Sequence, residues 1–270
     1  MSSVHPTAIV EDGASIADDV TVGPFTVIGP EVTLAEGVTV GSHAIVTGRT
    51  TVGPRTRISS HVFIGGEPQD LSYKGEDTGV TLGADCVVRE HATIHRGTSR
   101  GRGVTTLGDR CFLMVGSHVA HDCIVGDHAI LTNNALLGGH SQIGEYAILG
   151  GASAVQQFTR IGAHCFVGGL VGVAHDIVPY AMTVGHRAVI AGVNVRGLKR
   201  RGFDTEAIHA IRAAYRAFFQ TSGPRADRIA AVEQEFAGVP AVGAITTFLR
   251  VSGDRPLTLL RQTGIGNGDD

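Results

Sequence analysis

Aliphatic residues recur at every sixth position over most of this chain, from about Val4 to about Pro179. The repeat holds Val, Ile or Leu at 26 positions without one polar exception. These positions are Val4 and every sixth residue to Ile64, then Leu82, Val88 and Ile94, and then Leu107 and every sixth residue to Val173. Neither an amphipathic helix nor an alternating strand has a six-residue period. The pattern therefore predicts a parallel β-helix wound from short strands.

A second register lies four residues after these positions, where the residue is nearly always small or β-branched. Examples are Ala14, Thr26, Ala44, Thr56, Ala92, Ser117, Ala129, Ala135, Ser141, Ala147, Ser153 and Thr159. We expect these side chains at the tight inner corner of each coil. All four cysteines, Cys86, Cys111, Cys123 and Cys165, fall in this register. Their spacing matches no metal or redox motif, so we interpret them as small buried thiols in a reducing compartment.

The composition suits such a prism, because 38 glycines and a hydrophobic content of 43% without Trp favour thin β-layers closed by many turns. With three repeats per coil, 26 repeat positions give roughly nine coils, and at about 4.8 Å per coil the prism is roughly 43 Å tall. A prism this narrow has little interior. We therefore expect a homo-oligomer with clefts between its subunits.

Two loop-like insertions break the repeat, at about residues 66–79 and 96–106. Loops on a rigid solenoid commonly hold binding chemistry, and a tolerated surface insertion is the alternative. We predict a β-helix domain over residues 1–195 that contains both loops. The pattern then becomes helical, which predicts an α-helical C-terminal domain over residues 196–263 and a disordered tail over residues 264–270.

Three short helices are predicted in the C-terminal domain. Asp204 is the expected N-cap of the first, which the Ser-Gly-Pro sequence at 222–224 ends. The others are predicted over about 224–236 and 240–251. Together these helices would cap the prism.

The net charge of −3 does not mark the chain as a general nucleic-acid or membrane-surface binder. The stretch from Arg196 to Arg216, however, contains six Lys or Arg and only two acidic residues, which is a local excess of four positive charges. The N-terminus lacks the pattern of a signal peptide, and no stretch approaches the 18 apolar residues of a membrane span. We expect a soluble cytoplasmic protein without a nucleic-acid partner or a membrane span.

Six of the 13 histidines lie three residues after a repeat position, where we expect an exposed or interfacial edge of the prism. They are His43, His61, His91, His128, His140 and His164. His118 and His121 differ in context. Because one coil is 18 residues long, His121 stacks in line with Gly139, Gln157 and His175, and His140 lies close by. A general base about 5 Å from an exposed backbone N–H is the arrangement that acyl transfer requires.

Asp122 can orient or charge-stabilise the imidazole of His121 only from a corner of the coil, because neighbours on an ideal strand point to opposite faces. A zinc site is the chemical alternative, although the three-residue spacing of His118 and His121 has no decisive ligand signature. A trimeric scaffold without catalysis is a further alternative.

Six segments are more specific than the repeat. They are His5-Pro6-Thr7-Ala8, Gln69-Asp70-Leu71, Thr93-Ile94-His95-Arg96-Gly97-Thr98, His118-Val119-Ala120-His121-Asp122-Cys123, Gly192-Val193-Asn194 and Gly197-Leu198-Lys199-Arg200-Arg201-Gly202-Phe203. From about Val4 to about Arg250 the chain resembles the UDP-N-acetylglucosamine acyltransferases, which catalyse the first step of lipid A synthesis in Gram-negative bacteria. Parallel crossovers are normally right-handed, but proteins with this hexapeptide signature are left-handed. The resemblance thus implies a left-handed parallel β-helix.

The resemblance also implies a homotrimer with sites between subunits, which transfers an (R)-3-hydroxyacyl chain from acyl carrier protein to the 3-hydroxyl of UDP-N-acetylglucosamine. His121 would be the general base, Asp122 its partner and the Gly139 N–H the oxyanion donor. The residues that would hold the sugar nucleotide are Asp70, His118, His140, Gln157, Asn194, Arg200 and Arg201. The local positive charge fits a nucleotide diphosphate and an acidic carrier protein. No cofactor and no metal ion are expected.

Three positions depart from the family pattern. Ser72 stands where the family usually has Lys, Gln156 where it often has His, and Arg196 where it usually has Glu. Lys74 could replace the missing lysine by reaching back. One hypothesis is that the acceptor carries a 3-amino group in place of the 3-hydroxyl, as in some relatives, and another nucleotide sugar is a further alternative.

Gly169 occupies the position that limits the acyl pocket in the family. Its lack of a side chain predicts room for a longer chain, whereas Phe166 and Leu170 beside it could shorten the space.

Overall fold

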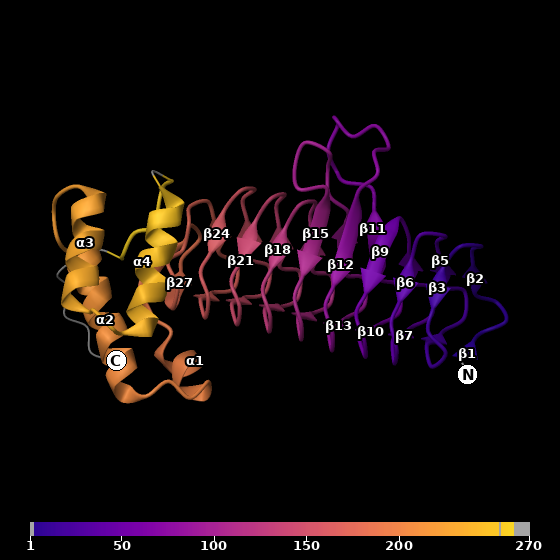
Figure 1. Ribbon diagram of the computed structural model, residues 1–270, viewed down its shortest axis with the longest axis horizontal. Coiled ribbons are helices and arrows are strands. Elements are labelled where there is room, and N and C mark those ends of the chain that lie inside the picture. The colour runs from indigo at the N-terminus through magenta and orange to yellow at the C-terminus, as the bar shows by residue number, and fades with distance from the viewer. Residues whose placement is uncertain (1–2, 254, 262–270) are drawn as a thin grey trace.

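The strands form three sheets that are the faces of a prism (Figure 1). The computed structural model describes residues 3–253 and 255–261. Sheet A contains, in order, β1 (Ser3–Val4), β4 (Thr21–Val22), β7 (Thr39–Val40), β10 (Arg57–Ile58), β13 (Val87–Val88), β16 (Phe112–Leu113), β19 (Ile130–Leu131), β22 (Ile148–Leu149), β25 (Phe166–Val167), β27 (Ala181–Val184) and β28 (Val189–Val193). Sheet B contains β2 (Ile9–Val10), β5 (Val27–Ile28), β8 (Ile45–Val46), β11 (Phe63–Gly66), β14 (Thr93–His95), β17 (His118–Val119), β20 (Leu136–Leu137), β23 (Ala154–Val155) and β26 (Gly172–Val173). Sheet C contains β3 (Ser15–Ile16), β6 (Thr33–Leu34), β9 (Arg49–Val52), β12 (Gly79–Leu82), β15 (Val104–Leu107), β18 (Ile124–Val125), β21 (Gln142–Ile143) and β24 (Arg160–Ile161).

The predicted repeat residues form the core. Each strand from β1 to β26 contains one of them, and the strands pair in parallel with the strand one coil on, as Val119 pairs with Leu137. From Val22 onward their exposure is at most 4%. Val4 and Val10 are 39% and 37% exposed, because the first coil is covered on one side only.

The small residues of the second register lie inside the corners, as predicted. The four cysteines are buried free thiols, and each donates to a backbone carbonyl oxygen, as Cys123 does to Gly138 at 3.3 Å. A larger side chain would not fit where the chain turns this tightly.

A left-handed turn residue allows each sharp change of direction between two-residue strands. The non-glycine residues with positive φ among the described residues are Phe25, His43, Arg55, His61, Asp85, His91, Arg110, Asp122, His128, Asn134, His140, Tyr146, Ala152, Phe158, His164, Leu170 and Tyr180. All but the last lie three residues after a repeat residue. They therefore form one column along each edge of the prism, and rings in these columns stack between coils, as those of His43 and His61 do at a centroid distance of 5.0 Å.

Aromatic rings of successive coils stack along the edge between sheets C and A. The rings of His128, Tyr146, His164 and Tyr180 follow one another at centroid distances of 4.4, 5.0 and 5.7 Å. His164, which was expected at an exposed or interfacial edge, is only 7% exposed. Phe203 from the C-terminal domain lies edge-on at 5.1 Å and covers it.

Both insertions leave the prism at the same edge. The first connects β11 to β12 and the second connects β14 to β15, so each leaves sheet B and returns in sheet C. In Figure 1 they rise together from one side of the prism. The next residues in this edge column are Asp122, His140 and Phe158, so the loops stand directly beside the candidate site.

The C-terminal part begins with the antiparallel pair of β27 and β28 and continues with helices that cover the end of the prism (Figure 1). The helices are α1 (Val195–Arg200), α2 (Thr205–Phe219), α3 (Arg225–Glu235) and α4 (Pro240–Ser252). The three predicted helices are confirmed, and Asp204 caps α2 by accepting a hydrogen bond from Ala207 N–H at 2.6 Å. Helix α1 was not predicted. The predicted tail over residues 264–270 lies outside the described residues, and none of the helices described is long and apolar enough to cross a membrane.

Burial of His164 predicts a pH-dependent stability. Burial, together with the nearby charge of Arg201, lowers the pKa of His164 to about 4. Below about pH 6.5 the unfolded chain binds a proton at this histidine, while the folded chain does not bind it until about pH 4. Stability should therefore fall as the pH is lowered through this window.

The substitution His164→Phe should flatten the decline in melting temperature between pH 6.5 and 4, measured by scanning calorimetry. Phe25 and Phe158 occupy equivalent left-handed turn positions, so phenylalanine suits the backbone. The substitution also removes the buried Nδ1 of His164, which has no hydrogen-bond partner among the described residues. An unchanged slope would show that His164 does not carry this pH dependence.

Candidate active site

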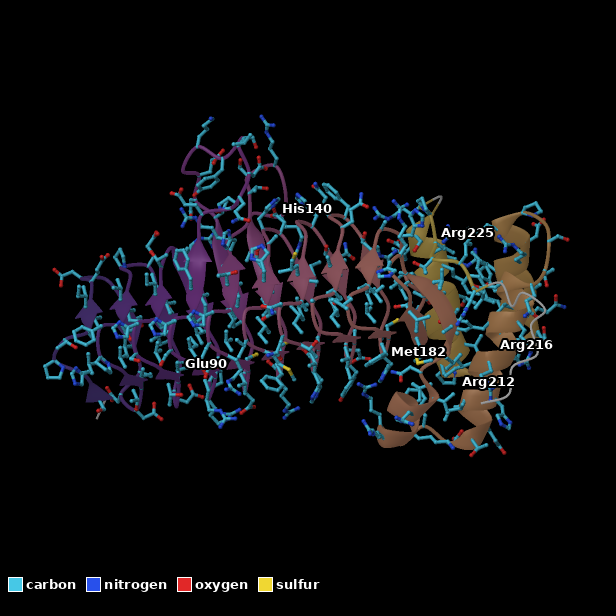
Figure 2. The ribbon with its side chains drawn as sticks, turned by 180° about the vertical axis from the view of Figure 1, so that it is seen from behind. Glu90, His140, Met182, Arg212, Arg216 and Arg225 are labelled. Atoms are coloured by element: carbon cyan, nitrogen blue, oxygen red, sulfur yellow. The ribbon has the colours of Figure 1, made fainter. Side chains whose placement is uncertain are left out.

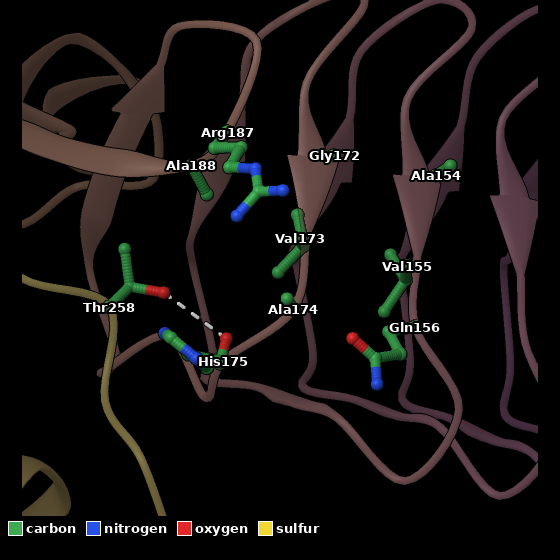
Figure 3. A pocket seen from close by; sticks show the side chains of 10 residues that line it. All are labelled: Ala154, Val155, Gln156, Gly172, Val173, Ala174, His175, Arg187, Ala188 and Thr258. Atoms are coloured by element: carbon green, nitrogen blue, oxygen red, sulfur yellow. Dashed lines mark hydrogen bonds between the residues drawn. The ribbon is translucent and has the colours of Figure 1, made fainter.

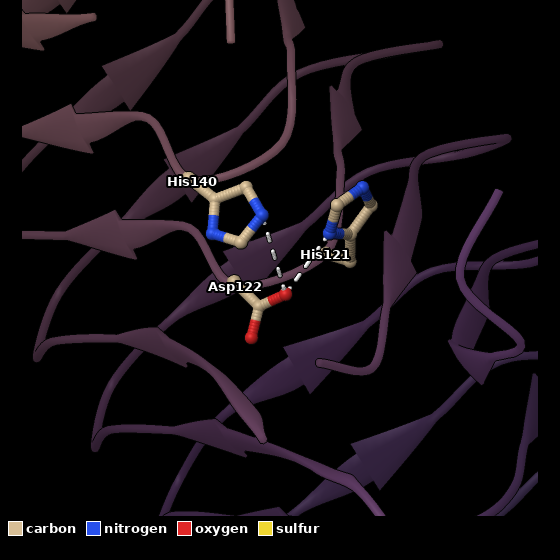
Figure 4. A group of neighbouring side chains, drawn as sticks. All are labelled: His121, Asp122 and His140. Carbon is tan, nitrogen blue, oxygen red and sulfur yellow. Dashed lines mark hydrogen bonds and ion pairs between the residues drawn. The ribbon is translucent and has the colours of Figure 1, made fainter. Parts of the chain in front are cut away.

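His121 and Asp122 lie in the turn that follows β17. Asp122 has a φ of 61°, and this left-handed conformation turns its carboxylate back toward the preceding side chain. Nδ1 of His121 lies 2.9 Å from Oδ2 of Asp122 (Figure 4). The prediction that Asp122 can reach His121 only from a corner is confirmed.

The second insertion wraps around the Asp122 carboxylate. Oδ1 accepts the N–H groups of Arg102 at 2.8 Å and Gly103 at 3.1 Å. Oδ2 accepts the hydroxyl of Thr98 at 2.7 Å and its N–H at 3.0 Å. Gly101 lies so close that a Cβ there would come within 2.4 Å of the carboxylate carbon. Sequence reasoning missed these contacts, although the glycines of the insertion are a signal of close backbone approach.

These hydrogen bonds decide the charge of Asp122. Its burial raises the pKa, but hydrogen bonds from His121, from Thr98 and from the loop N–H groups outweigh this effect and lower the pKa to about 2. The ionised carboxylate accepts a hydrogen bond from the N–H at Nδ1 of His121. Nε2 is then the basic nitrogen of the ring.

The His121 ring lies against Gly139, one coil further on. A Cβ at position 139 would be 2.6 Å from both Nε2 and Cε1 of His121, so only glycine permits this approach. Within the part of the chain that the structure describes, the Gly139 N–H donates no hydrogen bond. The base and a free donor therefore stand side by side.

Six of the predicted residues line one pocket of about 730 Å³. They are Asp70, His118, His121, Gly139, His140 and Gln157. Asp70 reaches the pocket from the first insertion, where its carboxylate accepts the N–H of Ser72 at 2.8 Å. Leu71 also lines the pocket and is fully exposed. Leu71 belongs to the Gln69-Asp70-Leu71 segment quoted above, but sequence reasoning gave it no role, because the insertion interrupts the period.

The two other histidines of the pocket are held neutral by their surroundings. Burial and the neighbouring His95 and His121 lower the pKa of His118 to about 4, and its Nδ1 lies 2.7 Å from the Thr93 hydroxyl. Burial also lowers the pKa of His140, whose ring stacks on Phe158 at 4.4 Å. At neutral pH both rings can exchange hydrogen bonds with a polar ligand without adding charge.

His121, Asp122 and His140 also form a group whose potential ligand atoms lie within 4.8 Å of one another. Such a group has the donor types of a zinc site. However, both carboxylate oxygens of Asp122 already accept hydrogen bonds from the second insertion. This arrangement favours a histidine–aspartate dyad over a metal centre.

Four predicted residues lie away from this pocket. Asn194 caps α1 by accepting the N–H of Gly197 at 3.1 Å and donates to the carbonyl oxygen of His164 at 2.9 Å. Arg201 donates to the carbonyl oxygen of Tyr146 at 2.8 Å, and Arg200 is exposed. These three lie beside the edge between sheets C and A. The fourth, Gly169, lies in the exposed turn before β26.

The three positions that depart from the family pattern lie in different places. Gln156 is exposed and lines the pocket beside Gln157. Ser72 lies in the first insertion, where its backbone closes a turn on Asp70, and Lys74 in the same loop is exposed. Arg196 is exposed on α1.

Known proteins resemble the chain over nearly its whole length. A protein that bears the name acyl-[acyl-carrier-protein]–UDP-N-acetylglucosamine O-acyltransferase in Rhizobium johnstonii is 45% identical over 255 residues, which are 94% of each chain. One of the same name from Azorhizobium caulinodans is 47% identical over 254 residues, again 94% of each chain. The chain belongs to the UDP-N-acetylglucosamine O-acyltransferase family.

The structural comparison agrees with this family. The UDP-N-acetylglucosamine O-acyltransferase of Moraxella catarrhalis superposes with a TM-score of 0.92 at 36% identity, covering 94% of this chain and 99% of the other. The Arabidopsis UDP-N-acetylglucosamine acyltransferase superposes with a TM-score of 0.81 at 33% identity, covering 95% of this chain and 99% of the other. Residues 176–258 match the family model of domain 2 of the UDP-N-acetylglucosamine O-acyltransferases, and residues 105–139 match the bacterial transferase hexapeptide model. The prism is thus the left-handed parallel β-helix of these acyltransferases.

The hydroxyl of Thr98 should contribute to the acyl transfer rate through Asp122. Thr98→Val removes one hydrogen bond to the ionised carboxylate but keeps the backbone N–H, and we expect kcat to fall about tenfold. The kcat of Thr98→Ser, which keeps the hydroxyl, should stay close to that of the unmodified protein. Steady-state kinetics of both variants test this, and equal kcat values would show that the hydroxyl has no part in positioning Asp122.

Proposed function

We propose that this protein transfers an (R)-3-hydroxyacyl chain from acyl carrier protein to the glucosamine 3-hydroxyl of UDP-N-acetylglucosamine in the cytoplasm, as the first step of lipid A biosynthesis. The observation that carries the proposal is the His121–Asp122 dyad, with Nδ1 and Oδ2 at 2.9 Å and the imidazole against Gly139. The names of the relatives, which are acyl-[acyl-carrier-protein]–UDP-N-acetylglucosamine O-acyltransferases, support the choice of substrates.

In the proposed reaction, Nε2 of His121 takes the proton of the sugar hydroxyl while the oxygen attacks the thioester carbonyl carbon. The negative charge that develops on the carbonyl oxygen is stabilised by the Gly139 N–H, and the ionised Asp122 stabilises the imidazolium. Collapse of the tetrahedral intermediate forms the ester and breaks the carbon–sulfur bond. The imidazolium then returns its proton to the leaving thiolate.

The sugar nucleotide is proposed to lie in the pocket of Asp70, His118, His140 and Gln157. The carboxylate of Asp70 is suited to a sugar hydroxyl, because its hydrogen bond to Ser72 lowers its pKa and keeps it ionised. The neutral imidazoles and the amide supply further donors and acceptors. These groups match the polar ring of a glucosamine.

We propose a homotrimer in which Asn194, Arg200 and Arg201 of one subunit complete the site of the next. Support comes from their place beside the edge between sheets C and A, whereas His121 lies on the edge between sheets B and C. Arginines suit the diphosphate of the nucleotide. The exposed Arg212 and Arg216 on α2 (Figure 2) offer positive charge to an acidic carrier protein.

An acyl transfer assay with UDP-N-acetylglucosamine and 3-hydroxyacyl carrier protein tests the proposed function. We expect His121→Ala to lower kcat by about three orders of magnitude, the size of a general-base contribution, while the variant still binds the nucleotide in calorimetry. A non-catalytic scaffold would show no transfer by either protein. A zinc enzyme would lose its activity on treatment with a chelator.

The same assay with the 3-amino sugar nucleotide decides the acceptor. The hydroxyl acceptor should be preferred under the proposal. A higher kcat/KM for the amino acceptor would instead support the hypothesis drawn from Ser72, Gln156 and Arg196.

Gly169 is proposed to leave room for a long acyl chain. A Cβ at this position would meet the Gly151 carbonyl oxygen at 3.3 Å, so a side chain must extend away from the prism into the space beside it. Gly169→Met should therefore shift the preferred donor to a shorter chain, measured with a series of acyl carrier protein thioesters. A sharp optimum at about ten carbons or fewer in the unmodified protein would contradict the proposal, since each methylene changes discrimination by about 1–3 kcal/mol.

A further inference from the structure

The first insertion borders two separate cavities. Asp70 and Leu71 line the active-site pocket. Further along the loop, residues 75–78 line a different pocket of about 570 Å³ together with Arg49 and Phe63 of the prism. The loop is therefore packed incompletely against the prism, and Leu71 beside Asp70 is fully exposed. Hydrogen bonds must fix the place of the Asp70 carboxylate in the active-site pocket.

Arg96, with which the second insertion begins, holds the first insertion through Tyr73. Its Nε and Nη2 donate to the Tyr73 hydroxyl oxygen at 3.0 and 2.8 Å, and its Nη1 donates to the carbonyl oxygen of Gly65 at 2.9 Å. The guanidinium carbon also lies 5.3 Å from the centroid of the Tyr73 ring. The planar fork of the arginine thus binds the loop and the end of β11 at the same time.

Tyr73 passes this constraint on within the loop. Its hydroxyl donates to the carbonyl oxygen of Glu76 at 2.9 Å, and its backbone N–H donates to the carbonyl oxygen of Asp70 at 3.0 Å. Among the described residues, Arg96 is the only one outside the first insertion that forms a hydrogen bond with residues 68–75. The place of Asp70 therefore depends on the contact between Arg96 and Tyr73.

The same short segment also holds the dyad. Thr98 follows two residues after Arg96, and its hydroxyl and N–H both donate to the Asp122 carboxylate. Gly97 between them lies so close to the returning chain that a Cβ there would come within 2.2 Å of the backbone nitrogen of Val104. One tightly packed piece of backbone therefore carries the contacts of both carboxylates.

We propose that Arg96 and Tyr73 are positioning residues, which hold Asp70 in the place where it binds the acceptor sugar beside His121. The inference rests on the proposed function, because it takes Asp70 as a ligand of the sugar. Without the contact, the loop would have to be ordered each time the sugar binds, and part of the binding free energy would be lost. The dyad keeps its own hydrogen bonds to Thr98, so the loss should appear in the KM for the sugar nucleotide and not in kcat.

The first insertion borders the site at one end only. Beyond Val155 and Gln156 the active-site pocket continues into a pocket of about 540 Å³ (Figure 3), and none of the described residues of either insertion lines it. Effects of the Arg96–Tyr73 contact should therefore be confined to the ligand that Asp70 binds. The KM for the acyl carrier protein should stay constant.

Steady-state kinetics of Tyr73→Phe, which removes the hydroxyl but keeps the ring, test this inference. We expect the KM for UDP-N-acetylglucosamine to rise about tenfold while kcat stays within about twofold. Arg96→Lys should act similarly, because one ammonium group cannot replace a fork that binds Tyr73 and Gly65 together. Arg49→Ala is the matched control. It removes an exposed ion pair of 2.8 Å to Asp77 in the same loop, and it should change none of these values.

A double-mutant cycle tests whether the contact acts through Asp70. In the Asp70→Ala background, Tyr73→Phe should raise the KM for UDP-N-acetylglucosamine by less than about twofold further, because the carboxylate that Tyr73 positions is gone. A purely structural role of Tyr73 would give the same rise in both backgrounds.

The outcomes separate this inference from the proposed function. If the unmodified protein transfers no acyl group to the sugar nucleotide, the proposed function fails. If it does transfer, the inference is overturned when Tyr73→Phe leaves the KM for the sugar nucleotide unchanged, lowers kcat alone, or acts equally in both backgrounds. It is also overturned when Arg49→Ala raises this KM as much as Tyr73→Phe does.

Discussion

The hydrogen bonds between successive coils are the constraint on which the rest of the molecule depends. Each strand pairs in parallel with the strand one coil on, so a residue is held in register with its counterpart 18 positions later wherever the repeat is uninterrupted. Side chains therefore occur in columns, with apolar columns inside and turn columns along the edges. His121, Gly139 and Gln157 meet because they share one column, and the backbone spacing sets the distance between their positions.

The dyad needs more than this regular framework. A carboxylate in the prism wall is costly unless hydrogen bonds replace its water. The second insertion supplies them, through the hydroxyl and N–H of Thr98 and the N–H groups of Arg102 and Gly103. An irregular loop thus stabilises the charge that the regular part could not hold, and the charge in turn orients the imidazole.

The parts predicted from sequence are those that obey the period. The strand positions, the small corner residues and the column of His121 all follow from counting, because one backbone geometry repeats. The contacts of Thr98 were missed because the insertion interrupts the count. Burial of His164 was missed because Phe203 covers it from beyond the repeat. Helix α1 has six residues, which is too short for a helical period, although the capping residue Asn194 is a local signal.

The two ends of the prism differ in how far other parts of the chain cover them. The C-terminal helices cover one end, whereas Val4, Ile9 and Val10 on the first coil are 39%, 58% and 37% exposed. An uncovered strand edge acts as a template on which another strand can pair. The molecule is therefore extendable in one direction only: a further coil of matching register could be grafted before Val4 without disturbing any column of the site, whereas at the other end it would displace the helices.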